Sequence, residues 1–415
     1  MSGETKGGEE MSREGISNRT GRGGGVAAVL AAVAMVASPA AAGGPSVRHT
    51  LRTAPALVGL RGLAQSEPYQ NAADALLERG VRQLPVHPAM GGAYTYRLDP
   101  ECGCYRRVTD DLGPWFVTER AQTLGAGLLN VGLTLGGYDL TDVDGCHFGD
   151  ERAPIRVSAA ALDYRAGTEL RYQVATLGLT YGVTDDLDVN LALPLALVDF
   201  GVNVSYSGGA SGPAFGSEHF HVGPNVMDML VRLKYRFLDR DGWAGAGGLR
   251  ARLPTGDPTE GLGTGDGELG PWLALSMALP DAWLDLHWDG GFDFDVTDVQ
   301  RSSAHYGFAL DLQRPGTEGW SRVSLSGQLL GRSEIDGVRA RTSVSGPHVV
   351  PGGIVNIPYL CLDPERQDYF DAVLGVRVRL LRSLVLSLGV FTPINRDTGV
   401  RPGGWSPVGS IEATF

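Results

Sequence analysis

From about residue 122 to residue 415 the chain consists of segments in which apolar residues alternate with small or polar ones. A period of two places alternate side chains on opposite faces of a sheet, so we interpret these segments as β-strands. The connections between them alternate in length without exception, long then short. A transmembrane barrel has this pattern, with short periplasmic turns and long outer loops, whereas soluble sandwiches mix their connection lengths.

The alternation predicts 12 strands. They span residues 122–135, 170–182, 187–206, 226–237, 243–253, 267–279, 283–294, 303–313, 320–331, 369–381, 384–391 and 407–415. The short turns are residues 183–186, 238–242, 280–282, 314–319 and 382–383, and the long loops are residues 136–169, 207–225, 254–266, 295–302, 332–368 and 392–406. We therefore predict an all-β fold, a transmembrane antiparallel up-and-down β-barrel of about 12 strands over residues 122–415, with both chain ends in the periplasm.

Each predicted strand has one charged face and one apolar face. In the strand 226–237, Leu233 and Tyr235 alternate with Lys234 and its charged neighbours. Because lipid excludes charge, we expect the charged faces to point into the lumen. The predicted lumen lining comprises Arg232, Lys234, Arg236, Arg250, Arg252, Asp285, His287, Asp289, Asp293, Asp311, Arg377 and Arg379. Its basic residues and its central aspartates occupy separate sectors, which would either select the solutes that pass or rigidify a filled interior.

Aromatic residues gather beside the short turns. Rings at such positions form the girdle that lies at the headgroup level of a membrane barrel. The predicted girdle comprises Tyr181, Tyr235, Phe237, Trp243, Trp283, Trp320 and Phe415. The segment from Gly409 to Phe415 is itself an alternating strand, which we expect to pair with residues 122–135, to close the ring and to engage the barrel-assembly machinery.

The first 121 residues lack the strand pattern of the barrel. Arg13, Arg19 and Arg22 precede an apolar run from Val26 to Ala37, and small residues follow it. This order is typical of a cleavable export signal, which we place at residues 1–42, with Met1 or Met11 as the start. Residues 43–121 show no strand pattern. They contain one short helical candidate near residues 72–79. We expect them to form a periplasmic N-terminal extension or a plug in the lumen.

The composition excludes several classes of protein. Sixty glycines and 20% charged residues are far from a helical bundle, and a net charge of -12 argues against a nucleic-acid partner. Four cysteines, Cys102, Cys104, Cys146 and Cys361, are too few for a disulfide scaffold and lack the paired spacing of a zinc site. We predict no cofactor, no metal ion and no catalytic residue.

Three histidines are compatible with an alternative hypothesis, that the chain is an enzyme. His219 and His221 lie one residue apart in the second loop, and His287 lies between two lumen aspartates. A histidine with an acidic or hydroxyl partner near a barrel mouth can serve a hydrolase. No nucleophile motif of the Gly-x-Ser-x-Gly type accompanies them. An outer-membrane hydrolase is therefore the third hypothesis, after a channel and a non-conducting barrel.

Several stretches resemble a family of outer-membrane proteins grouped as transporters for the meta-cleavage pathway of phenol degradation. The matching residues are Gly113 to Gly125, Leu177 to Asp188, Arg252 to Pro258 and Gly261 to Gly265, and the resemblance covers about residues 95–415. It implies an outer-membrane barrel that takes up aromatic or other hydrophobic compounds, and it assigns no binding residues.

Together these features predict a channel for passive or gated passage of small molecules across the outer membrane of a Gram-negative bacterium. Its expected partners are membrane lipid, the assembly machinery and a small-molecule solute. A non-conducting structural or surface barrel is the main alternative, and a lumen blocked by residues 43–121 would favour it. The sequence does not fix the substrate, the oligomeric state or the pairing of the cysteines.

Overall fold

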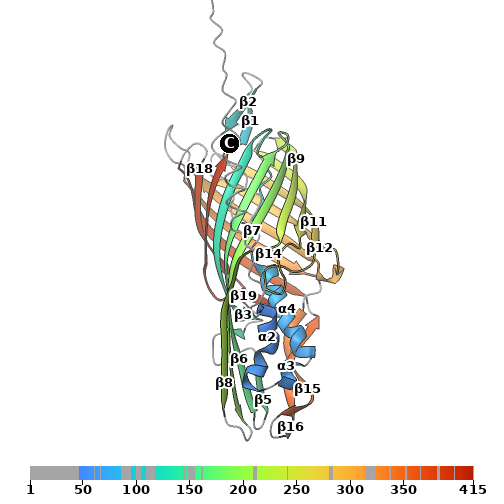
Figure 1. Ribbon diagram of the computed structural model, residues 1–415. Helices are drawn as coiled ribbons and strands as arrows, with labels where there is room; N and C mark the ends of the chain where they lie inside the picture. The colour runs from blue at the N-terminus through green and yellow to red at the C-terminus, as the bar shows by residue number, and fades with distance from the viewer. Residues whose placement is uncertain are drawn as a thin grey trace, which may run out of the picture. The chain divides into compact units, whose positions relative to one another are not determined.

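Figure 1 shows the computed structural model of the chain. It describes residues 46–85 apart from 60 and 66, and then residues 95–99, 104–108, 117–143, 146–147, 155–159, 162–208, 213–240, 242–279, 284–313, 323–335, 338–350, 353–364, 366–380, 384–396 and 398–414. The predicted export signal lies outside these residues, as do Trp283, Trp320 and Phe415.

Twelve antiparallel strands form a closed barrel, which confirms the predicted fold class. In ring order they are β3 (Leu129–Val143), β6 (Leu162–Gly182), β7 (Leu187–Gly208), β9 (Met229–Arg240), β10 (Trp243–Leu253), β11 (Glu268–Leu279), β12 (Leu284–Asp295), β13 (Ser303–Gln313), β14 (Val323–Glu334), β17 (Gln367–Arg379), β18 (Leu384–Pro393) and β20 (Ser406–Thr414). The last strand pairs with the first, from Val408 opposite Gly136 to Thr414 opposite Asn130. Closure leaves the barrel without an unpaired edge.

The first strand is displaced from its predicted position. It spans Leu129–Val143 rather than residues 122–135. Residues 122–128 alternate like a strand, but the backbone N–H groups of Leu124 and Ala126 donate to the side chains of Asp188 and Asp185, and the Thr123 hydroxyl donates to the carbonyl of Asp185. A buried backbone segment needs hydrogen-bond partners, and side chains supply them here as well as a neighbouring strand would.

Further strands lie within the predicted long loops. They are β4 (Cys146–His147), β5 (Ile155–Ala159), β8 (Ala214–Val226), β15 (Val338–Val350), β16 (Gly353–Pro364) and β19 (Val400–Pro402). A hairpin of β1 (Thr95–Asp99) and β2 (Cys104–Val108) precedes the barrel. β4, β5, β8 and β19 pair with the long strands β3, β6 and β7, because a strand that extends past its neighbour exposes backbone groups that another strand can pair. β15 and β16 form a separate hairpin.

The strands β6 and β7 extend well past the barrel. β7 pairs with β9 as far as Ala192, and from Leu195 onward it pairs with β8 instead. We call the extended part of this sheet, residues 162–175, 195–208 and 214–226, the projection. Over residues 167–175 and 195–205, one of its faces is buried and the other is mostly exposed, as alternation requires.

Helices cover the buried face of the projection. They are α2 (Val47–Thr53), the 3-10 helix η1 (Ala54–Val58), α3 (Arg61–Ala64) and α4 (Glu67–Gln83), which we call the cap. Leu51, Leu77 and Val81 of the cap share one apolar core with Tyr172 and Phe200 of the sheet. Burial of each such side chain stabilises the packing by roughly 1.5–3 kcal/mol. The cap therefore lies at the long-loop end of the strands (Figure 1).

The predicted helical candidate near residues 72–79 falls within α4. None of the described helices is both long enough and apolar enough to cross a membrane. The 3-10 helix η3 (Val299–Arg301) lies in the loop between β12 and β13.

The barrel carries an apolar exterior and a polar interior. Exposed aliphatic side chains follow one another around the ring: Leu133, Leu135, Val189, Leu191, Leu233, Leu249, Leu273, Leu275, Leu310, Leu312, Leu325, Leu374, Leu388 and Ile411. Charged side chains such as Arg232, Lys234 and Arg377 are buried on the opposite face of the same strands. A continuous apolar surface of this kind fits lipid and would be a liability in water.

A close backbone approach joins the start of the barrel to its first short turn. A Cβ atom at Gly182 would lie 1.8 Å from the carbonyl oxygen of Gly125. Because the obstacle is backbone, Gly182→Ala should lower the free energy of unfolding, by about 1–3 kcal/mol. The control is Gly327→Ala, whose Cβ would meet only Leu374 Cδ2 at 3.6 Å. Urea unfolding in lipid vesicles measures both, and equal stability of the two variants would contradict the prediction.

Candidate functional site in the barrel lumen

A stretch of chain runs inside the barrel. Residues 117–124, which we call the lumen segment, are almost completely buried. Gln328 Oε1 accepts hydrogen bonds from the backbone N–H groups of Val117 and Thr118, each at 3.3 Å. Asp289 Oδ1 accepts one from the N–H of Glu119, at 3.2 Å. The segment is thus held at this end by side chains of β12 and β14.

The other end of the lumen segment is held near a short turn. Ser276 Oγ accepts a hydrogen bond from the N–H of Ala121 at 2.9 Å, and Asp188 Oδ2 accepts one from the N–H of Leu124 at 2.9 Å. The hydroxyl of Thr123 donates to the carbonyl of Asp185 in the turn, at 2.6 Å. These wall residues come from distant strands, so the segment ties together parts of the ring that do not pair with each other.

Lys234 is the basic anchor of the lumen segment. Its ammonium donates to the carbonyl of Arg120 at 3.1 Å and to that of Gln122 at 3.3 Å. The carboxylate of Glu119 lies 3.6 Å from Lys234 Nζ and 3.8 Å from Arg232 Nη1. A buried ammonium group needs such partners, because an unpaired one costs several kcal/mol.

A chamber lies between the lumen segment and the end of α4. Its empty volume, open mouth included, is about 1040 Å³. Six arginines and five carboxylates line it: Arg82, Arg232, Arg250, Arg252, Arg332 and Arg401, with Glu119, Glu268, Asp289, Asp293 and Asp371. Its remaining wall includes Leu230, Leu330, Tyr306, Tyr369 and Phe391. The chamber is thus both charged and partly apolar.

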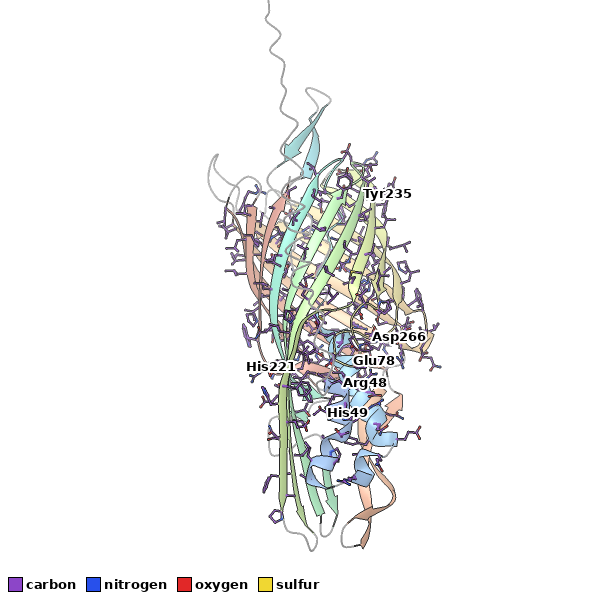
Figure 2. All side chains as sticks on the ribbon, viewed as in Figure 1. Arg48, His49, Glu78, His221, Tyr235 and Asp266 are labelled. Atoms are coloured by element: carbon purple, nitrogen blue, oxygen red, sulfur yellow. The ribbon has the colours of Figure 1, made fainter. Side chains whose placement is uncertain are left out.

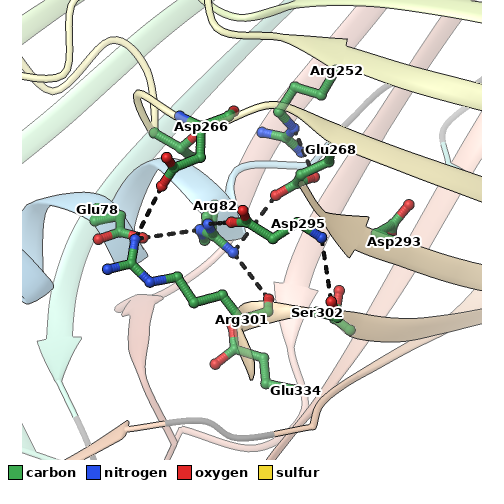
Figure 3. Close-up of polar contacts among 12 residues, drawn as sticks. Glu78, Arg82, Arg252, Asp266, Glu268, Asp293, Asp295, Arg301, Ser302 and Glu334 are labelled. Carbon is green, nitrogen blue, oxygen red and sulfur yellow. Dashed lines mark hydrogen bonds and ion pairs between the residues drawn. The ribbon is translucent and has the colours of Figure 1, made fainter. Parts of the chain in front are cut away.

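Arg82 at the end of α4 connects the cap to the barrel (Figure 3). Its guanidinium lies 2.6 Å from Asp295 and 3.6 Å from Glu268, two carboxylates of the barrel wall, and donates to the carbonyl of Arg301 at 3.1 Å. Within the helix it lies 3.2 Å from Glu78. With 5% of its side chain exposed, Arg82 is a buried link between helix and strands.

A second layer of charges surrounds this link (Figure 3). The guanidinium of Arg301 lies 3.0 Å from both Glu78 and Asp266. Burial raises the pKa of the Glu78 carboxyl, and the guanidinium groups of Arg82 and Arg301 offset part of that rise. Burial alone would lower the pKa of Arg82, but the carboxylates of Glu268, Glu78 and Asp295 outweigh it and raise that pKa. Arg82 therefore keeps its charge at the junction.

Two further ion pairs line the chamber wall. Arg250 forms a two-pronged pair with Asp293, and His305 Nδ1 lies 2.7 Å from Arg250 Nη2 and 3.2 Å from Asp293 Oδ2. Arg401 pairs with Asp371 and stacks 5.3 Å from the ring centre of Tyr369. Arg250 reaches across β11 at Gly270, where a Cβ atom would lie 2.7 Å from Asp293 Oδ1. The glycine leaves the room that this pair needs.

The structure brings five of the predicted lining residues together at the chamber: Arg232, Arg250, Arg252, Asp289 and Asp293. The others lie elsewhere. Arg236 binds Asp186 and Asp239 beside the short turns, at 2.7 Å and 2.9 Å. Arg377 pairs with Glu412 at 3.0 Å.

The remaining predicted lining residues are buried or half-buried in the wall away from the chamber: Asp285, His287, Asp311 and Arg379. The basic and acidic residues at the chamber pair with one another instead of standing in separate sectors.

Chamber residues that the sequence analysis missed are Arg82, Glu119, Glu268, His305, Arg332, Asp371 and Arg401. The alternation within β11, β13 and β14 places Glu268, His305 and Arg332 on the inward faces, so that pattern could have found them. No comparable signal marks Arg82 or Glu119, because both precede the barrel strands.

A serine, a histidine and an aspartate lie in a row across three strands. Ser276 Oγ is 2.8 Å from His287 Nδ1, and His287 Nε2 is 3.4 Å from Asp311 Oδ2. All three are at most 2% exposed, and none lines the chamber. Because Ser276 Oγ accepts the N–H of Ala121, this row helps to fix the lumen segment.

The described members of the predicted girdle are exposed. Tyr181, Tyr235, Phe237 and Trp243 have 49%, 55%, 56% and 50% of their surface accessible. They flank the short turns at the end of the strands opposite the cap, where Tyr235 is labelled in Figure 2.

No family model matches the chain, and no curated protein matches it. Solved structures with some likeness include an outer-membrane channel from Pseudomonas putida F1, with a TM-score of 0.43 and 15% identity over 74% of this chain and 100% of that one. The NanC porin has a TM-score of 0.33 and 9% identity over 69% and 98% of the two chains. A FadL homologue from Pseudomonas aeruginosa has a TM-score of 0.27 and 12% identity over 70% and 89%. The resemblance to phenol-degradation transporters stays a prediction.

Proposed function

We propose that the chain is an outer-membrane channel for small solutes, gated by its own N-terminal residues. The chamber carries this proposal: a charged space inside a closed barrel, bounded by the cap at one end and by the lumen segment at the other. A barrel that served only as a scaffold would have no need of a charged internal space. A gate is needed because the lumen segment occupies the path to the short-turn end.

The proposed solutes are small organic anions with an apolar or aromatic part. Arginines outnumber carboxylates in the chamber by six to five, and His305 adds a further polar group. Guanidinium groups bind carboxylates well, and Tyr306, Tyr369 and Phe391 offer apolar contact beside them. Aromatic acids would use both kinds of surface, which agrees with the aromatic compounds that the family resemblance implies.

The outer membrane of a Gram-negative bacterium is the proposed location. The exposed aliphatic band supports it, since lipid would cover that surface, and the exposed aromatic residues lie where a headgroup region would be. The proposed partners are membrane lipid and, through β20, the barrel-assembly machinery.

Ion selectivity tests the channel. In a planar bilayer under a salt gradient, the full mature chain should show discrete conductance steps with a modest preference for anions. Arg252→Ala and Arg250→Ala should each shift the reversal potential toward cations, because they remove positive charge from the chamber. Arg236→Ala is the matched control, since Arg236 pairs beside the turns and should leave selectivity unchanged.

A non-conducting barrel is the second candidate. The observation that favours it is the lumen segment, whose burial and hydrogen bonds resemble those of a fixed plug. Silence in the bilayer, both for the full chain and for a variant without residues 46–84, would support this reading and would reject the channel.

A further inference from the structure

The exposed face of the projection carries three potential metal ligands. Asp199 on β7 stands opposite His221 on β8, and Gly201 stands opposite His219. Because residues two apart on a strand share a face, Asp199 and both histidines point the same way. The neighbouring residues Val198 and Phe200 are buried beneath the cap, so the three polar side chains lie on the outer face. His221 is labelled in Figure 2.

The three side chains converge on one oxygen. His219 Nε2 lies 2.7 Å and His221 Nδ1 lies 3.3 Å from Asp199 Oδ1. One ligand atom from each residue can be chosen so that all three lie within 4.8 Å of one another. The imidazole rings stand at 89° with their centres 5.0 Å apart, so they approach the carboxylate from different directions.

The oxygen of Asp199 that both histidines approach is shielded from solvent. This Oδ1 atom accepts no hydrogen bond with acceptable angles from the described residues. The ring nitrogens of His219 and His221, at 2.7 Å and 3.3 Å, are its close polar neighbours. A shielded carboxylate oxygen needs a partner, and a metal ion held between it and these nitrogens would supply one.

We propose that Asp199, His219 and His221 bind a divalent transition metal ion such as Zn²⁺, Cu²⁺ or Ni²⁺. Imidazole nitrogen and carboxylate oxygen are ligands for these ions, whereas Ca²⁺ and Mg²⁺ prefer oxygen alone. Tetrahedral Zn²⁺ with bonds of 2.0–2.1 Å separates its ligand atoms by about 3.3 Å. The distance from His221 Nδ1 to Asp199 Oδ1, 3.3 Å, already has this value, and His219 Nε2, now at 2.7 Å, would move away from that oxygen by about 0.6 Å.

The site has room for that movement and for a fourth ligand. The side chains of His219 and His221 are 55% and 69% exposed, so their rotamers are not locked by packing. Glu169 on β6 stands opposite Gly201, which in turn stands opposite His219. A Cβ atom at Gly201 would lie 3.2 Å from His219 Cδ2 and 3.9 Å from Glu169 Oε2. The glycine keeps this gap clear, so Glu169 or water can complete the coordination.

The sequence analysis missed this site because one ligand is distant in the chain. The two histidines form a His-x-His pair, but Asp199 lies 20 residues before His219. Only the pairing of β7 with β8 brings the carboxylate beside them. A bound ion would join these two strands outside the barrel, and this inference does not depend on conduction through the lumen.

Direct metal binding tests the proposal. The full mature chain, purified without a polyhistidine tag and freed of metal with a chelator, is titrated with Zn²⁺ alone and the bound metal is counted by mass spectrometry. We expect one ion per chain, and His219→Ala or His221→Ala should each weaken binding by at least about tenfold. His49→Ala is the matched control and should bind Zn²⁺ like the parent, because His49 belongs to α2 of the cap (Figure 2), which packs on the buried face of the projection and not on the face that carries the site.

The outcomes separate a site from adventitious binding. X-ray absorption at the zinc edge should show two imidazole ligands with nitrogen at 2.0–2.1 Å from the ion. A chain that takes up no Zn²⁺, or one whose His219→Ala and His221→Ala variants bind it as tightly as the parent, would overturn the proposal. Both substitutions are on the surface, and the same shift in electrophoretic mobility on heating as the parent shows would demonstrate that the barrel still folds.

Discussion

Replacement of Arg82 by methionine is expected to raise the conductance of the barrel several-fold. Methionine keeps much of the length of the side chain but removes the charge that meets Asp295 and Glu268 on the barrel and Glu78 on the helix. Two wall carboxylates would then be left with a buried apolar neighbour, which is strongly unfavourable. The expected response is release of the end of α4 from the wall, which opens the chamber toward the long-loop end.

The measurement is single-channel recording in a planar bilayer, with the parent and variant proteins at equal amounts. Arg52→Met is the matched control, because Arg52 pairs with Asp74 inside the cap and forms no hydrogen bond or ion pair with the described residues of the barrel. That variant should conduct like the parent. If Arg82→Met folds, as judged by mobility on heating, and still conducts like the parent, the cap is not the gate.

The strands of the barrel could be predicted from the sequence because their environment imposes one rule. Because lipid lies outside and polar groups lie inside, apolar and polar side chains must alternate along every strand. Short turns also fix how neighbouring strands pair in register. The predicted span 243–253 agrees with β10, and 303–313 agrees with β13. The prediction of the first strand failed because residues 122–128 follow the same period but do not form a strand. Their backbone N–H groups bond to Asp188, Asp185 and Gly182 instead of to a neighbouring strand along their length.

The candidate site could be predicted only in part. Inward charges such as Arg250 and Asp293 follow from alternation, but their pairing does not. The pairing requires a residue without a side chain on the strand between them. Gly270 is that residue, because a Cβ atom there would lie 2.7 Å from Asp293 Oδ1. The roles of Arg82 and Glu119 depend on where the N-terminal residues fold back, and no local pattern encodes that. The Asp199 site could not be predicted for a similar reason, because only the pairing of β7 with β8 brings its ligands together.

The charges of the chamber serve two purposes at once. Paired charges such as Arg250 with Asp293 satisfy each other, so the wall is stable without a solute. The same groups keep exposed edges toward the chamber, where 23% of the Arg250 side chain is accessible. A passing anion can therefore compete for the guanidinium without leaving the aspartate unpaired for long. Tight pairing would also keep the resting chamber close to neutral.

Breaking the pair of Arg250 with Asp293 is expected to have the largest effect on stability. Asp293 has only 9% of its side chain exposed, so Arg250→Met would leave its carboxylate with His305 as the remaining close partner. Removing one partner of a buried ion pair costs roughly 3 kcal/mol of unfolding free energy. Asp293→Asn should cost a similar amount, since Arg250 would then lack its counter-charge.

The double variant Arg250→Met with Asp293→Asn should lose less stability than the sum of the two single variants. Neither remaining side chain is charged, so the largest penalty disappears. Urea unfolding in lipid vesicles gives all the free energies, with the exposed pair of Arg171 and Asp139 as the control cycle. Those two side chains are 54% and 52% exposed and 3.3 Å apart, so their coupling should be about 0–1 kcal/mol. Simple additivity at Arg250 and Asp293 would mean that solvent, rather than the partner, satisfies each charge, and the chamber would then be more open than its geometry indicates.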